Sequence, residues 1–114
     1  MVEDSKDTRD MMKILLSSYG YDVVEAIDGI EAVDQAVLEK PDLILMDIGM
    51  PIADGLFAVE VIRQHEKLVD IPIVAVTAHG DLYNEKAKEA GCIAVVQKPL
   101  NFEEFESVVQ QYVS

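Results

Sequence analysis

The chain has 114 residues, of which 50% are hydrophobic and 27% charged, a composition that suits one domain with a packed core rather than a disordered chain. Lysine and arginine number 9 against 22 acidic residues, and the net charge of −13 repels phosphate backbones, so we expect no direct binding to nucleic acid. The sequence lacks both a signal peptide and an apolar run near the roughly 18 residues that a membrane helix needs, which predicts a cytoplasmic protein without membrane contact.

Short apolar runs predict the strands. Consecutive apolar residues occupy positions 23–24, 43–46, 73–76 and 93–96, and a further run of two, 1–2, opens the chain. Continuous runs of this length are typical of strands that are buried on both faces, as in a parallel sheet.

Helical patterns follow these runs. The stretches 11–15, 30–37, 59–62 and 102–112 carry apolar residues at helical spacing, and the stretch 82–90 is charged and alanine-rich. Capping residues mark three helix starts, namely Asp4 or Ser5, Asp28 and Asn101. Strands that alternate with helices predict an α/β fold, in which helices cover both faces of a doubly wound parallel sheet.

Polar side chains stand where the predicted strands end. Glu3 and Asp4 follow the first strand. Asp47 follows the third strand, Thr77 the fourth and Lys98 the fifth. The carboxyl ends of parallel strands meet at one edge of the sheet, where binding sites form, so we expect these five side chains to converge.

A cluster of carboxylates requires a cation. Two carboxylates about 4 Å apart repel each other by about 4 kcal/mol at an effective dielectric constant of 20. Mg²⁺ removes this repulsion, and proteins typically hold it with one or two carboxylates, waters and phosphate oxygens. Phosphoryl transfer needs such a metal, fixed positive and hydroxyl donors, and a nucleophile. Asp47 is the candidate nucleophile, because carboxylates can form aspartyl phosphates.

These residues resemble the receiver domain of two-component response regulators. The resemblance covers essentially the whole chain and rests on an ordered set of motifs: Glu3-Asp4, LILMDIGMP at 43–51 with Asp54-Gly55 after it, Val76-Thr77-Ala78, and Lys98-Pro99. It implies that residues 1–114 form one receiver domain with a five-stranded flavodoxin-like sheet in the order 2-1-3-4-5 and five helices. It further implies a phosphorylation-dependent signalling switch in a phosphorelay, not an enzyme with a separate substrate.

The resemblance also implies which residues hold the metal. Asp4, Asp47 and the backbone carbonyl of Gly49 would ligate Mg²⁺, and Glu3 would act on the metal through water. Asp47 would accept the phosphoryl group from a phosphohistidine on a histidine kinase or a histidine phosphotransfer protein. A downstream protein partner would then respond to the phosphorylated form.

Two further residues complete the implied site. Thr77 would hydrogen-bond the phosphoryl group and move with its loop. Lys98 would pair with the phosphoryl oxygens, and its bond to Pro99 would be cis, as in the family.

The sequence departs from the family at the first strand and near the site. Only Met1 and Val2 precede the acidic pair, where family members carry a longer apolar run. We therefore expect a truncated first strand, unpaired backbone groups on its neighbours, and a domain that gains from apolar residues added before Val2 or from association with a second copy. Val95 stands where the family usually has an aromatic residue, and Gly49 and His79 occupy positions that influence the lifetime of the phosphoryl group.

Two other functions remain open. A phosphatase of the haloacid dehalogenase type needs a second acid two residues after the nucleophile, and Gly49 occupies that position. An inert pseudo-receiver, which only binds other proteins, would be expected to lose one of Asp47, Thr77 or Lys98, and all three are present.

Overall fold

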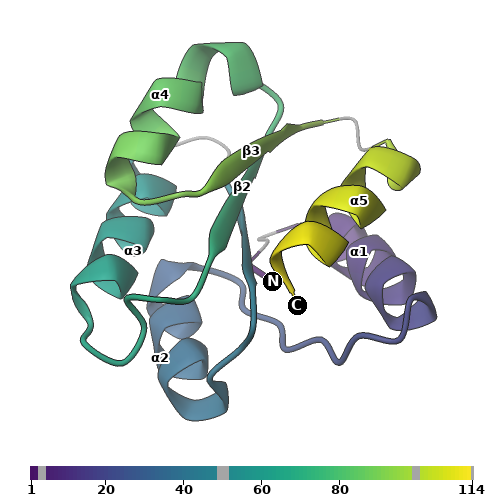
Figure 1. The fold of residues 1–114 in the computed structure, drawn as a ribbon, viewed down its shortest axis with the longest axis horizontal. Helices are drawn as coiled ribbons and strands as arrows, with labels where there is room; N and C mark the ends of the chain where they lie inside the picture. The colour runs from purple at the N-terminus through teal and green to yellow at the C-terminus, as the bar shows by residue number, and fades with distance from the viewer. Residues whose placement is uncertain (3–4, 49–51, 99–100, 114) are drawn as a thin grey trace.

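The computed structural model describes residues 1–2, 5–48, 52–98 and 101–113. Within these ranges the chain forms five helices and three strands (Figure 1). The helices are α1 (Lys6–Ser18), α2 (Gly29–Glu39), α3 (Ile52–Gln64), α4 (Gly80–Ala90) and α5 (Phe102–Tyr112), and the strands are β1 (Ile44–Asp47), β2 (Ile73–Thr77) and β3 (Ala94–Gln97). No helix in the described part of the chain has the length and apolar character to cross a membrane.

The strands form a parallel sheet in the order β1-β2-β3, with Ile44 opposite Ile73. Single parallel bridges continue this sheet beyond β1. Val2 pairs with Met46 of β1 on one side and with Ala26 on the other. The order across the molecule is therefore the segment at Ala26, then Val2, β1, β2 and β3, which corresponds to the predicted order 2-1-3-4-5.

The first two predicted strands are reduced to these bridges, and the prediction of a strand at Val23-Val24 is wrong. A strand persists only where a neighbour supplies hydrogen bonds along its length. Met1 and Val2 reach only the segment 24–26, so the residues before it have no strand beside them in the described structure. The segment 24–26 therefore takes the position of the second strand through hydrogen bonds to Met1 and a bridge to Val2.

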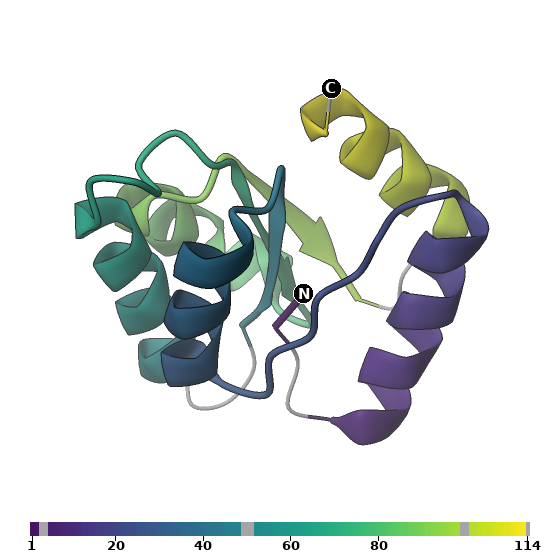
Figure 2. The same cartoon turned by 90° about the horizontal axis from the view of Figure 1, so that it is seen from below.

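Two helical layers enclose the sheet (Figure 2). Helices α2, α3 and α4 cover one face, and α1 and α5 cover the other. Alternate side chains of a strand point to opposite faces, so β2 contributes Ile73 and Ala75 to one layer and Val74 to the other. We call the resulting clusters the α2–α4 core, which includes Val59, Ile62, Ile73 and Ala75, and the α1–α5 core, which includes Met12, Leu16, Val74 and Phe105.

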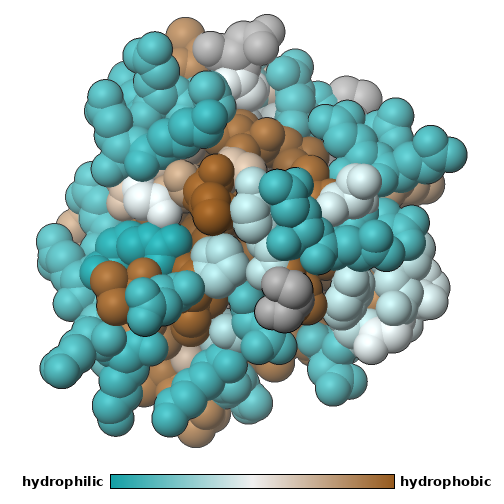
Figure 3. All heavy atoms as spheres, in the orientation of Figure 1, coloured by the Kyte–Doolittle hydropathy of each residue, from teal (hydrophilic) through white to brown (hydrophobic). Residues whose placement is uncertain are grey.

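Side-chain caps fix three helix starts at the predicted residues. Ser5, Asp28 and Asn101 each accept a hydrogen bond from the backbone N–H three residues later, at 3.4, 2.9 and 3.2 Å. These bonds satisfy N–H groups that the first helical turn leaves unpaired. Outside the cores, hydrophilic side chains cover most of the face seen in Figure 3, as the net charge of −13 requires.

Candidate functional site

Asp47 is the last residue of β1, and the sheet sets its position from both sides. Its backbone N–H donates to the carbonyl of Val2 at 2.9 Å. The N–H of the next residue, Ile48, donates to the carbonyl of Val76 in β2 at 2.8 Å. The Asp47 side chain is 11% exposed, so its carboxylate lies at the rim of the core and not in open solvent.

Lys98 approaches Asp47 from the other side of β2. It directly follows β3, and its backbone N–H donates to the carbonyl of Thr77 at 2.8 Å. Its Nζ lies 2.9 Å from Oδ1 of Asp47, in an ion pair that spans the carboxyl edge of the sheet. The structure therefore brings together an acid and a base that are 51 positions apart in the sequence, at the ends of non-adjacent strands.

Oδ1 of Asp47 is buried, and among the described residues it receives no hydrogen bond. The ammonium group of Lys98 neutralises its charge at 2.9 Å, but the contact lacks hydrogen-bond geometry. A buried polar atom without a hydrogen bond costs about 1–3 kcal/mol. The site is therefore suited to a further ligand, either a cation or a group that carries donors.

Thr77 ends β2 between the two charged residues and is 1% exposed. Its Oγ1 accepts a hydrogen bond from the backbone N–H of His79 at 3.1 Å, so the oxygen holds the loop that leads into α4. A hydroxyl that accepts a bond keeps its own proton for donation. Thr77 can therefore donate to an anion at the edge while it shapes the loop, a second role that the sequence did not indicate.

Gly80 forms a contact between α4 and β3 that the sequence reasoning missed. A Cβ atom at Gly80 would lie 3.0 Å from Oε1 of Gln97, the residue just before Lys98. The start of α4 thus packs against the Gln97 side chain at the end of β3, and a Cβ atom at position 80 would require that side chain to shift. The available signal was a glycine three positions after the strand-end Thr77.

Several predicted site residues lie outside the described part of the chain. They are Glu3, Asp4, Gly49 and Pro99, so the full metal-ligand set and the cis bond at Pro99 stay predictions. The described residues contain no group of three metal-binding side chains. Asp47 is the one expected metal ligand that lies in the described part of the chain. Its Oδ1 receives no hydrogen bond there, which fits the preference of Mg²⁺ for oxygen ligands.

Comparison with known families identifies one that spans nearly the whole chain. Residues 1–110 match the family described as the response regulator receiver domain. Among characterised proteins, the polar-differentiation response regulator DivK of Brucella anthropi is 34% identical over 116 residues, which cover 99% of this chain and 93% of DivK.

Solved structures share the fold. The receiver domain of the sensor histidine kinase PA1611 from Pseudomonas aeruginosa, which contains a magnesium ion in its active-site cleft, superposes with a TM-score of 0.88 at 34% identity. The match covers 98% of this chain and 93% of that one. The chemotaxis protein CheY4 of Vibrio cholerae superposes with a TM-score of 0.88 at 29% identity, over 97% of this chain and 93% of CheY4.

Proposed function

Because the chain belongs to the response regulator receiver domain family of two-component systems, we propose that it is a phosphorylation-dependent switch whose phosphoacceptor is Asp47. A histidine kinase or a histidine phosphotransfer protein donates the phosphoryl group, and a downstream protein binds the phosphorylated form. We expect the switch to act in the cytoplasm, without direct contact with nucleic acid or a membrane.

The proposed reaction transfers a phosphoryl group from nitrogen to oxygen. A carboxylate oxygen of Asp47 attacks the phosphorus, the P–N bond of the phosphohistidine breaks, and the imidazole nitrogen keeps the electron pair. The product is an acyl phosphate on Asp47. Later attack by water on the phosphorus releases inorganic phosphate and restores the carboxylate. The chain therefore hydrolyses only the phosphoryl group that it carries itself.

Lys98 and Thr77 stabilise the transferred group in this proposal. The Lys98 ammonium lies 2.9 Å from Oδ1 of Asp47 and pairs with a phosphoryl oxygen once the carboxylate is esterified. The Thr77 hydroxyl donates its proton to another phosphoryl oxygen, and the loop at His79 follows the hydroxyl because the two are hydrogen-bonded. Through this hydrogen bond, phosphorylation of Asp47 can change the position of the loop that leads into α4.

Glu3, Asp4, Asp47 and the carbonyl of Gly49 are the residues that we propose to hold Mg²⁺. The metal supplies positive charge to the phosphoryl oxygens. The magnesium ion reported for the receiver domain of PA1611 supports this assignment. The single observation that carries the proposed function is the ion pair of Lys98 with a buried Asp47 oxygen that lacks a hydrogen bond.

Incubation with acetyl phosphate and Mg²⁺, followed by intact-mass measurement, tests the proposal. We expect the protein to gain one phosphoryl group, Asp47→Asn to gain none, and a chelator to prevent the gain. Asp42→Asn is the matched control, because Asp42 lies just before the opposite end of β1, and it should react normally.

Other outcomes of this experiment favour other functions. Unchanged mass in the parent protein would favour the inert pseudo-receiver. Rapid consumption of excess acetyl phosphate without a stable phosphoprotein would favour a phosphatase. Uptake by Asp47→Asn at the parent rate would contradict the assignment of Asp47.

A further inference from the structure

Helices α2 and α3 carry exposed apolar side chains that belong to neither hydrophobic core. Ile30 is 79% exposed, Leu38 74% and Phe57 66%, which places them among the five most exposed large apolar side chains of the described residues. Single apolar side chains are ordinary on a protein surface, whereas several that lie together mark an interaction site. Their importance therefore depends on whether they share one face.

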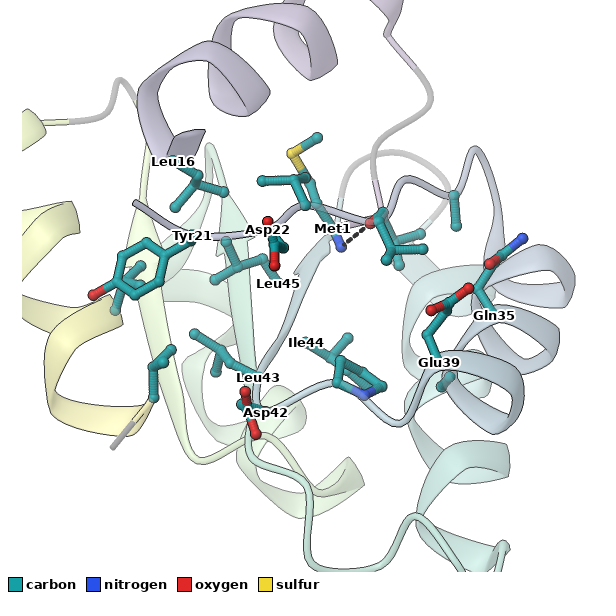
Figure 4. Close-up of a pocket in the computed structure, with 18 of the residues that line it drawn as sticks. Met1, Leu16, Tyr21, Asp22, Gln35, Glu39, Asp42, Leu43, Ile44 and Leu45 are labelled. Carbon is teal, nitrogen blue, oxygen red and sulfur yellow. Dashed lines mark hydrogen bonds between the residues drawn. The ribbon is translucent and has the colours of Figure 1, made fainter. Parts of the chain in front are cut away.

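Gln35 and Glu39 show how α2 is turned. Both line a cavity beside β1 to which no described residue of α3 contributes (Figure 4), so their flank of α2 faces away from α3. A helix turns about 100° per residue, which puts Ile30 about 140° around the axis from Gln35, on the flank toward α3. Asp34 and Leu38 follow Ile30 at intervals of four residues, and the exposure of all three side chains shows that this row runs along the outer surface.

Arg63 shows how α3 is turned. It donates to the carbonyl of Gly91 at 2.9 Å, directly after α4, so its flank of α3 faces α4. Val61 lies about 200° around the axis from Arg63, on the flank toward α2, and Phe57 lies one turn before Val61. The two helices pack against each other (Figure 2), so this row lies beside the row of α2. The two rows form one surface, which we call the α2–α3 face: Ile30, Asp34, Leu38, Phe57 and Val61.

The α2–α3 face is negatively charged. Asp34 is exposed within it, and Glu60 is exposed three residues after Phe57, which makes the two neighbours on the helix surface. Arg63 is the single basic residue of the two helices, and its guanidinium group is bonded to main-chain carbonyls on the flank toward α4. Lys40, just after α2, lines the cavity on the opposite flank. The face therefore combines apolar side chains with carboxylates.

This combination favours one kind of occupant. A second copy of the chain would bring the same carboxylates opposite one another, and each copy carries a net charge of −13, so self-association is disfavoured. The row from Ile30 to Leu38 extends about 12 Å along the helix axis. A helix that presents apolar anchors at i, i+4 and i+7 covers a similar length. Basic residues beside these anchors would complement the carboxylates.

We propose that the α2–α3 face binds a basic amphipathic helix of a partner protein. The apolar anchors of that helix cover Ile30, Leu38 and Phe57, and its lysine or arginine residues pair with Asp34 and Glu60. Docking of this kind takes its affinity from the apolar anchors and its specificity from the charges. The proposed phosphorylation site lies at the ends of the strands and not on these two helices, so binding here does not require a phosphoryl group.

Titration with a designed peptide tests the proposal. The probe is a fluorescein-labelled peptide of about 18 residues, long enough to form a helix, with leucines on one face and lysines on the other. We expect saturable binding by fluorescence anisotropy, and at saturation the NMR methyl signals of Ile30 and Leu38 should shift. Ile14 of α1 and Leu82 of α4, which are 71% and 68% exposed, serve as references. Unchanged signals of Ile30 and Leu38, or equally large shifts at Ile14 or Leu82, would overturn the proposal.

Matched variants separate this face from general apolar attraction. Each variant replaces one isoleucine, one leucine and one phenylalanine, all more than half exposed, so both should remain folded. The face variant combines Ile30→Gln, Leu38→Gln and Phe57→Gln. The control variant combines Ile14→Gln, Leu82→Gln and Phe102→Gln. The face variant should bind the peptide at least tenfold more weakly and the control variant like the parent, and equal affinities of the two variants would overturn the proposal.

A second pair of variants tests the charges. Asp34→Asn with Glu60→Gln should weaken binding several-fold, whereas Glu103→Gln with Glu104→Gln, two exposed carboxylates of α5 on the other side of the sheet, should not. Equal weakening by both pairs would mean that the total charge attracts the peptide, and would overturn the proposed partner. Sedimentation of the parent chain as a dimer that the face variant converts to a monomer would overturn it in favour of a second copy.

Discussion

The Lys98–Asp47 pair can be tested as a unit, because each partner is mostly buried. Lys98→Met leaves the Asp47 carboxylate at the rim of the core without its cation, and we expect a loss of about 1–3 kcal/mol in the free energy of unfolding, the cost of a buried polar group that loses its partner. Asp47→Asn removes the charge that needs neutralising. A double-mutant cycle measured by urea denaturation should therefore give a coupling energy of about 0.5–3 kcal/mol. Additive single losses would show that the two side chains do not interact in solution.

The amino group of Met1 predicts a pH dependence of stability. Burial lowers its pKa from 8.0 to about 6, and the carboxylate of Glu25 opposes the shift only partly. Between these values the unfolded chain binds more protons than the folded one, so stability falls as pH drops from 8 to 6. The loss attributable to this group is about 2 kcal/mol.

Urea denaturation at several pH values checks this expectation, on protein whose intact mass shows that Met1 is retained. Acetylation of the amino group removes its titration, so the difference between acetylated and parent chains isolates its contribution. Parallel pH profiles for the two forms would contradict the assignment.

Arg63 connects three elements at the amino ends of the strands. From α3 it donates to the carbonyl of Gly91 at 2.9 Å, which precedes β3, and to that of Ile71 at 2.6 Å, which precedes β2. A further bond of 3.1 Å reaches the carbonyl of Val69. One side chain therefore fixes the end of the sheet that lies opposite the proposed phosphorylation site.

Gly91→Ala should disturb this connection. Gly91 has a φ of +127°, and a Cβ there would lie 2.5 Å from Cγ of Arg63. Backbone strain costs about 1–3 kcal/mol and overpacking a similar amount. Gly20→Ala is the matched control, because Gly20 has a φ of +91° but nothing within 4 Å of a Cβ. Urea denaturation should show a clearly larger loss for Gly91→Ala, and equal losses would mean that Arg63 moves aside freely.

The elements with strong local signals were predictable from the sequence. The caps Asp28 and Asn101 fix their helices through bonds to residues three positions later, so a short stretch of sequence contains the whole interaction. The predicted strand at Val23-Val24 is not formed. A strand needs a hydrogen-bonded neighbour along its length, and in this segment Met1 and Val2 pair only with Val24 and Ala26. β-branched residues indicate that a segment can pair, but they do not indicate whether a partner is available.

The same reasoning applies to the site. The strand-end rule places Asp47, Thr77 and Lys98 at one edge because parallel strands share a direction, and this can be read from order alone. The bond from the N–H of His79 to the hydroxyl of Thr77 depends on the path of a loop, and the close approach of Gly80 to β3 depends on packing between elements. Neither has a periodic signal in the sequence.

The net charge of −13 acts on the whole molecule. Carboxylates repel one another more strongly in the compact state, so added salt should stabilise it. The Debye length falls from about 10 Å at 0.1 M to about 3 Å at 1 M. We expect the melting temperature to rise with NaCl at pH 7 and to respond much less near pH 4.3, the pI of the chain. Equal salt responses at the two pH values would point to hydrophobic salting-out instead.

The bonds of Arg63 have a consequence for sequence tolerance. Its acceptors are main-chain carbonyls, which every amino acid carries, so the interaction is indifferent to the side chains of the loop it holds. Val69 and Asp70 are exposed, and a library that randomises these two positions should yield mostly folded proteins. A second library that randomises position 63 should yield few folded proteins, because no other side chain offers the fork of donors of Arg63. The surface residues at the amino end of the sheet can therefore change, because Arg63 alone maintains the backbone geometry there.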